Sequence, residues 1–156
     1  MVQQFARVAR PFFVLLAIFT AARWLQGTVF GVPYEKGTWL FSIVMLTIMG
    51  SLFSTAYTRR WLGWQLGRAA LFAMFLALTA QVVILLSTAA SYALGLSTYF
   101  NYQTALNQQE AVGVGQALGI RVGGLVVNTL VSGIAGALGW ALGGLLPARP
   151  EAGGPR

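Results

Sequence analysis

The sequence predicts an all-α integral membrane protein: a bundle of four transmembrane helices, of which the fourth is rich in glycine. Hydrophobic residues make up 57% of the chain and charged residues only 8%, whereas soluble domains carry about 25% charged residues. Residues 69–109 contain no charged side chain. So few charges cannot cover the surface of a soluble domain, and a bilayer is therefore the expected solvent.

The first span is expected over residues 11–30. Residues 1–10 are basic and fit an interfacial helix leading into the membrane, with a secretory signal peptide as the alternative. Pro11 suits a first helical turn, where no N–H is needed. Arg23 interrupts the apolar run roughly 18 Å into the span. It is expected to snorkel to the far interface or to form an ion pair, because ionisable groups at this depth need a partner or water.

The second span is expected over residues 38–57, after a tight loop at residues 31–37. Thr47, Ser51 and Thr55 recur every four residues and therefore share one helical face. Small residues at this spacing are typical of helix–helix contacts in lipid, so we predict that they pack against another helix. A hydroxyl-lined transport path is the alternative interpretation.

Basic and aromatic residues alternate between the second and third spans. We predict that these side chains lie at the level of anionic lipid headgroups on the cytoplasmic side. Interleaved arginine and tryptophan can also bind single-stranded nucleic acid, but the position between two spans favours the membrane surface, and no nucleic-acid partner is expected. The residues are Arg59, Arg60, Trp61, Trp64 and Arg68.

The third span is expected over residues 69–96. As a helix it measures about 42 Å against a hydrocarbon core of about 30 Å, so it must tilt or project beyond the membrane. Gln81 lies near its middle and is expected to hydrogen-bond a neighbouring helix, or alternatively to contact a ligand.

Residues 97–119 form the longest polar region and are our candidate for recognising a partner or small ligand, because loops on a rigid scaffold often carry function. An ordinary connector is the alternative. We expect aromatic residues at the membrane surface followed by a short surface helix over residues 102–112. Glu110 is predicted to form an ion pair with Arg121 or Arg23.

The fourth span is expected over residues 122–146 and completes a single transmembrane domain over residues 1–146. Glycines recur along one face of this helix and allow another backbone to approach closely. Residues 147–156 are rich in proline and glycine and are expected to form a flexible tail. The glycines predicted to pack against other helices are Gly123, Gly133, Gly136, Gly139 and Gly143.

Four spans place both termini on one side of the membrane. The arginines of residues 1–10, 58–68 and 147–156 fall on that side, whereas Lys36 on the other side is offset by Glu35. Cytoplasmic segments carry the excess of basic residues. We therefore expect cytoplasmic termini, in a multi-pass protein of a bacterial inner membrane.

The residue inventory restricts the chemistry of this chain. It contains no cysteine, histidine or aspartate, and its three glutamates lie in different loops or in the tail. Disulfides, zinc–cysteine sites and histidine-ligated haem are thereby excluded within the chain. General acid–base catalysis also lacks its usual groups. We predict no catalytic residue, no metal site and no cofactor, so a self-contained enzyme is not expected.

These observations predict a structural or accessory subunit that packs into a larger membrane complex through its small-residue helix faces. The expected partners are other integral membrane subunits and anionic lipids. A homo-oligomeric small channel or transporter component is the alternative. Its path would use Thr47, Ser51, Thr55, Gln81 and Asn128, or Arg23 for an anion.

Overall fold

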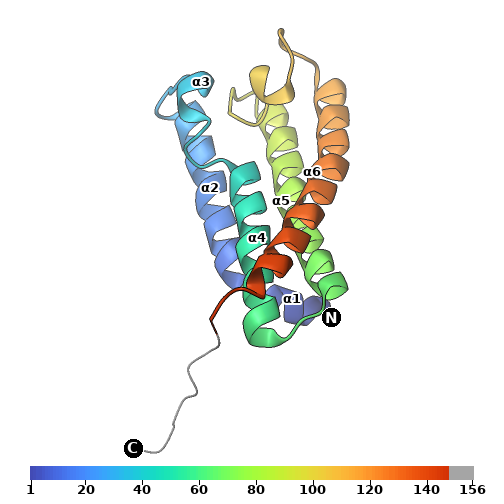
Figure 1. Cartoon of the computed structure of the whole chain (residues 1–156). Helices are drawn as coiled ribbons and strands as arrows, with labels where there is room; N and C mark the ends of the chain where they lie inside the picture. The colour runs from blue at the N-terminus through green and yellow to red at the C-terminus, as the bar shows by residue number, and fades with distance from the viewer. Residues whose placement is uncertain (148–156) are drawn as a thin grey trace, which may run out of the picture.

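The computed structural model describes residues 1–147, and this part of the chain is helical with no strand. The N-terminus, the α4–α5 connection and the end of α6 lie at one end of the molecule, and α3 with residues 94–113 lies at the other (Figure 1). The elements are α1 (Val2–Val8), α2 (Arg10–Thr28), α3 (Tyr34–Gly37), α4 (Ile43–Leu62), α5 (Leu66–Ala93), the 3-10 helix η1 (Thr104–Leu106) and α6 (Val114–Gly143).

Three of the helices described, α2, α5 and α6, are long and apolar enough to cross a membrane. The expectation of a helical protein with several apolar spans is confirmed at this level. The remaining long helix, α4, has 20 residues but is not among these three. Its composition explains the difference, since it contains Thr47, Ser51, Ser54, Thr55, Thr58, Arg59 and Arg60.

Two of the long helices begin five or more residues away from the expected position. The second long helix starts at Ile43 rather than at residue 38, because Phe41 adopts a left-handed conformation (φ 59°) and Ser42 caps the helix by accepting a hydrogen bond from the Met45 N–H at 3.4 Å. The fourth starts at Val114 instead of residue 122, so Arg121 lies inside it.

The prediction of a short surface helix over residues 102–112 is wrong. This segment contains only the three-residue η1 and turns. Asn107 ends η1 in the left-handed conformation (φ 55°), which stops helix propagation and which asparagine tolerates better than most residues.

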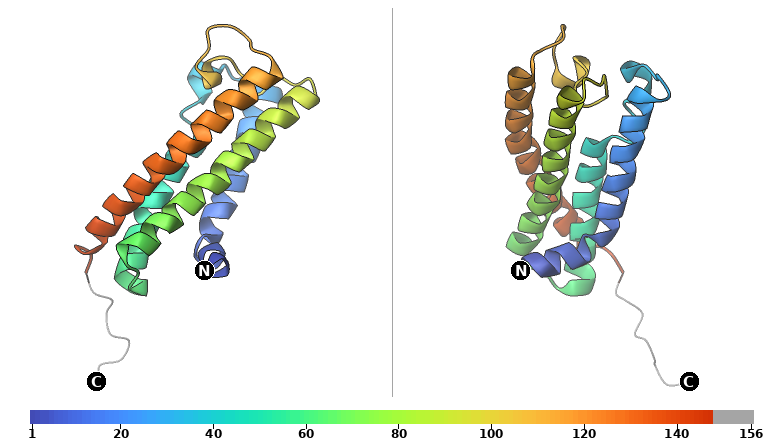
Figure 2. Two further views of the ribbon diagram at one scale, coloured as in Figure 1. Left: turned by 90° about the vertical axis from the view of Figure 1, so that its right-hand side faces the viewer. Right: turned by 180° about the vertical axis from the view of Figure 1, so that it is seen from behind.

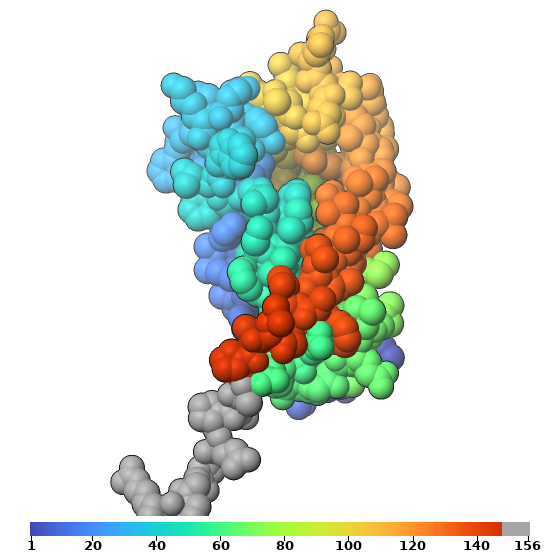
Figure 3. Space-filling view, in the orientation of Figure 1, coloured from blue at the N-terminus to red at the C-terminus, as the bar shows by residue number. Residues whose placement is uncertain are grey.

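Glycines of α6 bring its backbone directly onto α4 and α5. A Cβ atom on Gly139 would overlap the Leu52 carbonyl, and one on Gly136 would overlap the Ala73 Cβ. At Gly143 it would lie 2.6 Å from the Ala56 carbonyl oxygen. Figure 3 shows the consequence: α6 crosses over the lower part of α4, and a hollow opens above the crossing, between α3 and the upper part of α6.

The other two glycines predicted to pack differ in their surroundings. A Cβ on Gly133 would lie 3.1 Å from the Met74 Cγ, whereas Gly123 has nothing within 4 Å. Gly123 therefore makes no close helix contact within residues 1–147, and its assignment to a packing face is not supported there.

The hydroxyl face of α4 is buried in the bundle. Thr47, Ser51 and Thr55 are each at most 1% exposed. Thr47 donates to the Ile43 carbonyl at 2.7 Å and Thr55 to the Ser51 carbonyl at 2.8 Å. The Thr47 and Thr55 hydroxyls thus satisfy themselves on their own helix, whereas the buried Ser51 hydroxyl has no hydrogen-bond partner among residues 1–147.

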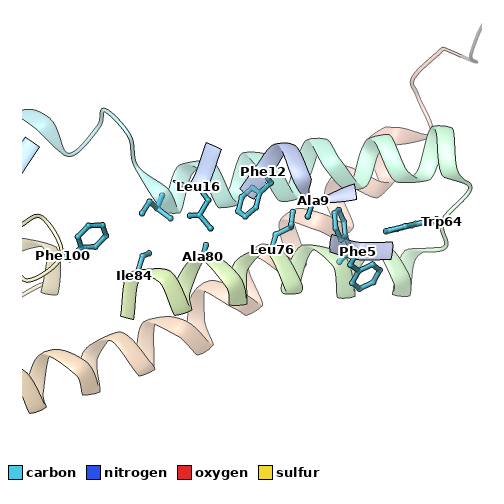
Figure 4. Close-up of a cluster of buried hydrophobic side chains, with 11 residues drawn as sticks. Phe5, Ala9, Phe12, Leu16, Trp64, Leu76, Ala80, Ile84 and Phe100 are labelled. Carbon is cyan, nitrogen blue, oxygen red and sulfur yellow. The ribbon is translucent and has the colours of Figure 1, made fainter. Parts of the chain in front are cut away.

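A band of apolar side chains connects the two ends of the bundle. It joins α1, α2, α4 and α5 and runs from Phe5 and Trp64 at one end to Ile84 and Phe100 at the other (Figure 4). At the first end the ring of Phe5 lies 5.5 Å from that of Trp64 and 5.2 Å from that of Phe72. Helices α5 and α6 run side by side and obliquely to α2 (Figure 2), so the band fills the space between α2 and α5.

Replacing Gly139 with alanine is expected to destabilise the bundle by about 1–3 kcal/mol, because an added methyl group overpacks a closed contact. Gly123→Ala is the matched control in the same helix. It should be neutral or stabilising by about 1 kcal/mol, since alanine favours helix over glycine. Thermal unfolding in detergent, followed by tryptophan fluorescence, measures both. Equal midpoints for the two variants would contradict the assigned contact.

Candidate functional site

Two loops fold over the end of the bundle that lies away from the N-terminus and are joined there by tyrosines. The Tyr99 hydroxyl, on the 94–113 loop, donates to the carbonyls of Val32 at 2.8 Å and Pro33 at 3.1 Å. The ring of Tyr34 stacks on Tyr102, with centroids 5.3 Å apart, and meets Tyr99 edge-on at 5.2 Å. We call Tyr34, Tyr99 and Tyr102 the tyrosine cap.

Arg23 of α2 lies beneath this cap and is only 8% exposed. Its guanidinium lies 5.3 Å from the ring centroid of Tyr99 and 5.9 Å from those of Tyr34 and Phe100. Its single hydrogen bond among residues 1–147 is a long one, 3.5 Å, to the Thr38 carbonyl. Aromatic faces attract a cation, so the cap holds Arg23 in place without neutralising it.

Arg121 of α6 approaches the same region from the opposite side of the bundle. It donates from Nη2 to the Phe100 carbonyl at 2.6 Å and from Nε to the Thr88 hydroxyl at 3.2 Å. The Thr88 hydroxyl in turn donates to the Phe100 carbonyl at 3.1 Å. Phe100 is thus the shared contact of both arginines, through its ring for Arg23 and its carbonyl for Arg121.

Both arginines line one cavity of about 120 Å³, together with Tyr34, Thr38 and Tyr99. A second cavity of about 450 Å³ adjoins it, and Arg121 belongs to the walls of both. The residues that the two cavities share are Val44, Ile84, Ala105 and Arg121, and the second cavity adds the amides of Gln81, Asn107 and Asn128. We call the two cavities together the arginine cleft.

The predicted ion pairs of Glu110 are wrong. Glu110 is exposed in a turn, and within the part of the chain that the structure describes it pairs with neither arginine. Arg121 instead uses backbone and hydroxyl acceptors, because α6 begins earlier than expected and carries this residue into the bundle. Arg23 is buried under the cap and forms no ion pair among residues 1–147, and its position at the far membrane interface stays a prediction.

At the other end of the bundle lies the basic connector, residues 59–68, in which Arg59 joins two helices. Arg59 donates to the carbonyls of Trp140 at 2.8 Å and Ala141 at 3.0 Å, near the end of α6. A cation at a helix C-terminus is favourable. Its guanidinium also lies 3.9 Å from the ring centroid of Trp140, so Arg59 locks α4 to α6.

The other members of this connector divide between surface and core. Trp61 is 39% exposed, but Trp64 is 4% exposed and packs in the core, so its expected place at the lipid headgroups is wrong. Arg68 lies over the Trp64 ring and donates to the Gln4 side chain. Arg60 donates to the Pro147 carbonyl at 2.9 Å.

Comparison with protein-family models, curated proteins and solved structures finds no match to this chain. Functional inference therefore depends on the geometry of the molecule itself.

The arginine cleft presents polar groups that can hydrogen-bond a ligand. Its polar groups are guanidinium, phenol, hydroxyl and amide, and no group of three acidic or histidine side chains that could hold a metal occurs among residues 1–147. Sequence reasoning singled out Arg23, Arg121 and Gln81 one at a time. It missed Tyr34 and Thr38, whose only signal was their place in a loop beside an apolar span.

Burial raises the pKa of the Tyr99 phenol above its usual range, although the charge of Arg23 acts in the opposite direction. The folded chain therefore holds this proton more tightly than the unfolded chain. Its contribution to stability is complete below the ordinary tyrosine pKa of about 10 and is lost as pH rises through the folded pKa. In an ultraviolet titration, Tyr99→Phe should remove the last tyrosine to ionise, and Tyr102→Phe should retain it. A late-ionising phenol that survives in Tyr99→Phe would contradict this assignment.

Proposed function

We infer that this chain is a non-catalytic integral membrane protein with four spans and cytoplasmic termini, and that it works as an accessory subunit of a larger membrane complex. The observation that carries this inference is the two-sided character of α6. One face packs closely on α4 and α5, and the opposite face is apolar and exposed. The exposed residues, each at least half exposed, are Val126, Leu130, Ile134, Leu138 and Leu142.

The internal position of α4 supports its role as a span in addition to α2, α5 and α6. Its 20 residues extend about 30 Å, enough for the hydrocarbon core. Its hydroxyl face packs inside the bundle, with Thr47 and Thr55 bonded to the backbone of α4 itself, so these polar groups do not meet lipid. Arg59 and Arg60 fall at its end, beside the N-terminus of the chain, where the excess of basic residues favours the cytoplasm.

Single cysteines can test the number of spans, because the chain contains none of its own. Lys36, in the short helix α3, is exposed, and so are Gln65 and Ser97 in loops. With four spans, a membrane-impermeant maleimide should label Lys36→Cys and Ser97→Cys from outside, and Gln65→Cys only after permeabilisation. Labelling of Lys36→Cys and Gln65→Cys from the same side would show that α4 does not cross.

The accessory role is supported by how little of the chain lies outside its helices and by how much apolar helix surface remains uncovered. On α2, Val14 is 61% and Ile18 52% exposed, and on α6 Ile134 is 64% exposed. In a bilayer such faces contact either lipid or another membrane helix. Gly133, Gly136, Gly139 and Gly143 of α6 already pack within the bundle, so partners along this part of the helix would meet its large aliphatic side chains.

Isolation from native membranes in a mild detergent should recover the 16.7 kDa chain in an assembly of fixed stoichiometry, detected by native mass spectrometry. Ile134→Trp should release the partners, because it adds bulk to the exposed face of α6. Ile134→Leu, which keeps an apolar side chain of similar size at the same position, is the control and should retain them. A wild-type chain that is stable and monodisperse alone would contradict the accessory role.

A channel or transporter component is the second candidate, favoured by the presence of two arginines in one cavity. The inward-facing hydroxyls of α4 favour it less, because Thr47 and Thr55 donate to their own helix and are buried. Reconstitution into liposomes separates the two functions: a porter should form a homo-oligomer and support anion flux, whereas an accessory subunit should do neither.

A further inference from the structure

We propose that the arginine cleft is a binding site for an oxyanion, a phosphate or carboxylate group, which Arg23 and Arg121 hold from opposite sides. This proposal is independent of the number of spans and of the accessory role. Lipid phosphodiesters and small soluble anions share this chemistry, and the experiment below separates them.

The arginine cleft carries two positive charges. Two guanidinium groups line one cavity, and within residues 1–147 neither forms an ion pair with a carboxylate. Burying a cation without a counter-charge is unfavourable, and two cations in one cavity also repel each other. An anion placed between them removes both penalties.

The arginine cleft also contains N–H donors that have no acceptor. Each guanidinium carries five N–H donors in a rigid fork. Among residues 1–147, Arg23 uses one in a long bond and Arg121 uses two. The Gln81 Nε2, in a side chain only 4% exposed, has no acceptor and lines the adjoining cavity. Buried donors are normally satisfied, so the cleft presents donors in excess, as an oxyanion requires.

Contacts with the rest of the fold hold both arginines of the cleft in position. The tyrosine cap holds Arg23, and the Phe100 carbonyl and Thr88 hydroxyl hold Arg121. These contacts fix the guanidinium groups before a ligand arrives, which lowers the entropic cost of binding. The adjoining cavity, with amides at Gln81 and Asn128 and aliphatic side chains at Ile84 and Val127, has room for the remainder of a ligand.

The experiment measures thermal unfolding of the full chain in a neutral detergent, using its five tryptophans. The probes are sodium phosphate, compared with sodium chloride at equal ionic strength, and short-chain phosphatidylglycerol, compared with phosphatidylcholine of the same chain length. We expect a saturable rise in the unfolding midpoint with phosphate, with phosphatidylglycerol or with both. A response to phosphate alone identifies a soluble anion. A response to phosphatidylglycerol, alone or together with phosphate, identifies a lipid headgroup.

Arg23→Gln and Arg121→Gln should each weaken the response at least about tenfold, because each removes a charged donor. Arg121→Lys should weaken it less, since the charge remains. Arg10→Gln is the matched control, since Arg10 is an exposed arginine, and it should respond like the wild-type chain. An equal response in wild type and both glutamine variants, or no response to either probe, would overturn the proposal.

A second measurement on the wild-type chain does not depend on the variants folding. Phenylglyoxal modifies accessible arginines, and peptide mass spectrometry locates the products. The probe that raises the midpoint should protect Arg121, which is partly exposed, while leaving modification of the exposed Arg10 unchanged. Equal protection of both arginines would show a general salt effect and would also overturn the proposal.

Discussion

At Gly139 the backbone of α6 lies against the Leu52 carbonyl of α4 with no room for a single methyl group. Gly143 and Ala56 repeat this contact one turn further along, and Arg59 closes it by donating to the last carbonyls of α6. Two helices that touch this closely at one end and cross at an angle must separate at the other. The crossing therefore sets the position of α6 along its whole length.

The arginine cleft lies on the diverging side of this crossing. The shorter α4 begins only at Ile43, whereas α6 extends back to Val114, so α6 continues beyond α4 toward the tyrosine cap. Residues 29–42 and 94–113 cover this end with aromatic rings but leave the cavities between α4, α5 and α6. The close glycine contacts at one end of the bundle and the cavities at the other end therefore have the same cause, the crossing of α6 over α4.

The sequence allowed a correct prediction of what depends on composition and helical period. The all-helical class, the long apolar spans and the small-residue face at Thr47, Ser51 and Thr55 are local properties of the chain. The helix ends were harder to predict from the sequence. A charge at Arg121 looked like a membrane boundary, and the stop at Phe41 came from backbone geometry that no residue pattern announced.

The candidate site was least predictable, because its parts come from α2, α6 and two loops and meet only in the folded chain. Arg23 and Arg121 each looked like a residue in need of a carboxylate, and Glu110 was predicted to pair with one of them. The fold supplies Phe100 as the acceptor and contact for both instead, and leaves the two positive charges facing one cavity.

This arrangement links the stability of the tyrosine cap to any anion that neutralises Arg23 and Arg121. The cap binds Arg23 through aromatic faces, and Arg121 binds the loop backbone at Phe100, so repulsion between the two guanidinium groups acts directly on residues 94–113. An anion between them turns that repulsion into attraction across the loop. Occupation of the cleft should therefore strengthen the contacts that residues 94–113 already make at this end of the bundle. The contact between Gly139 and Leu52 should stay unchanged, because it involves no charged group.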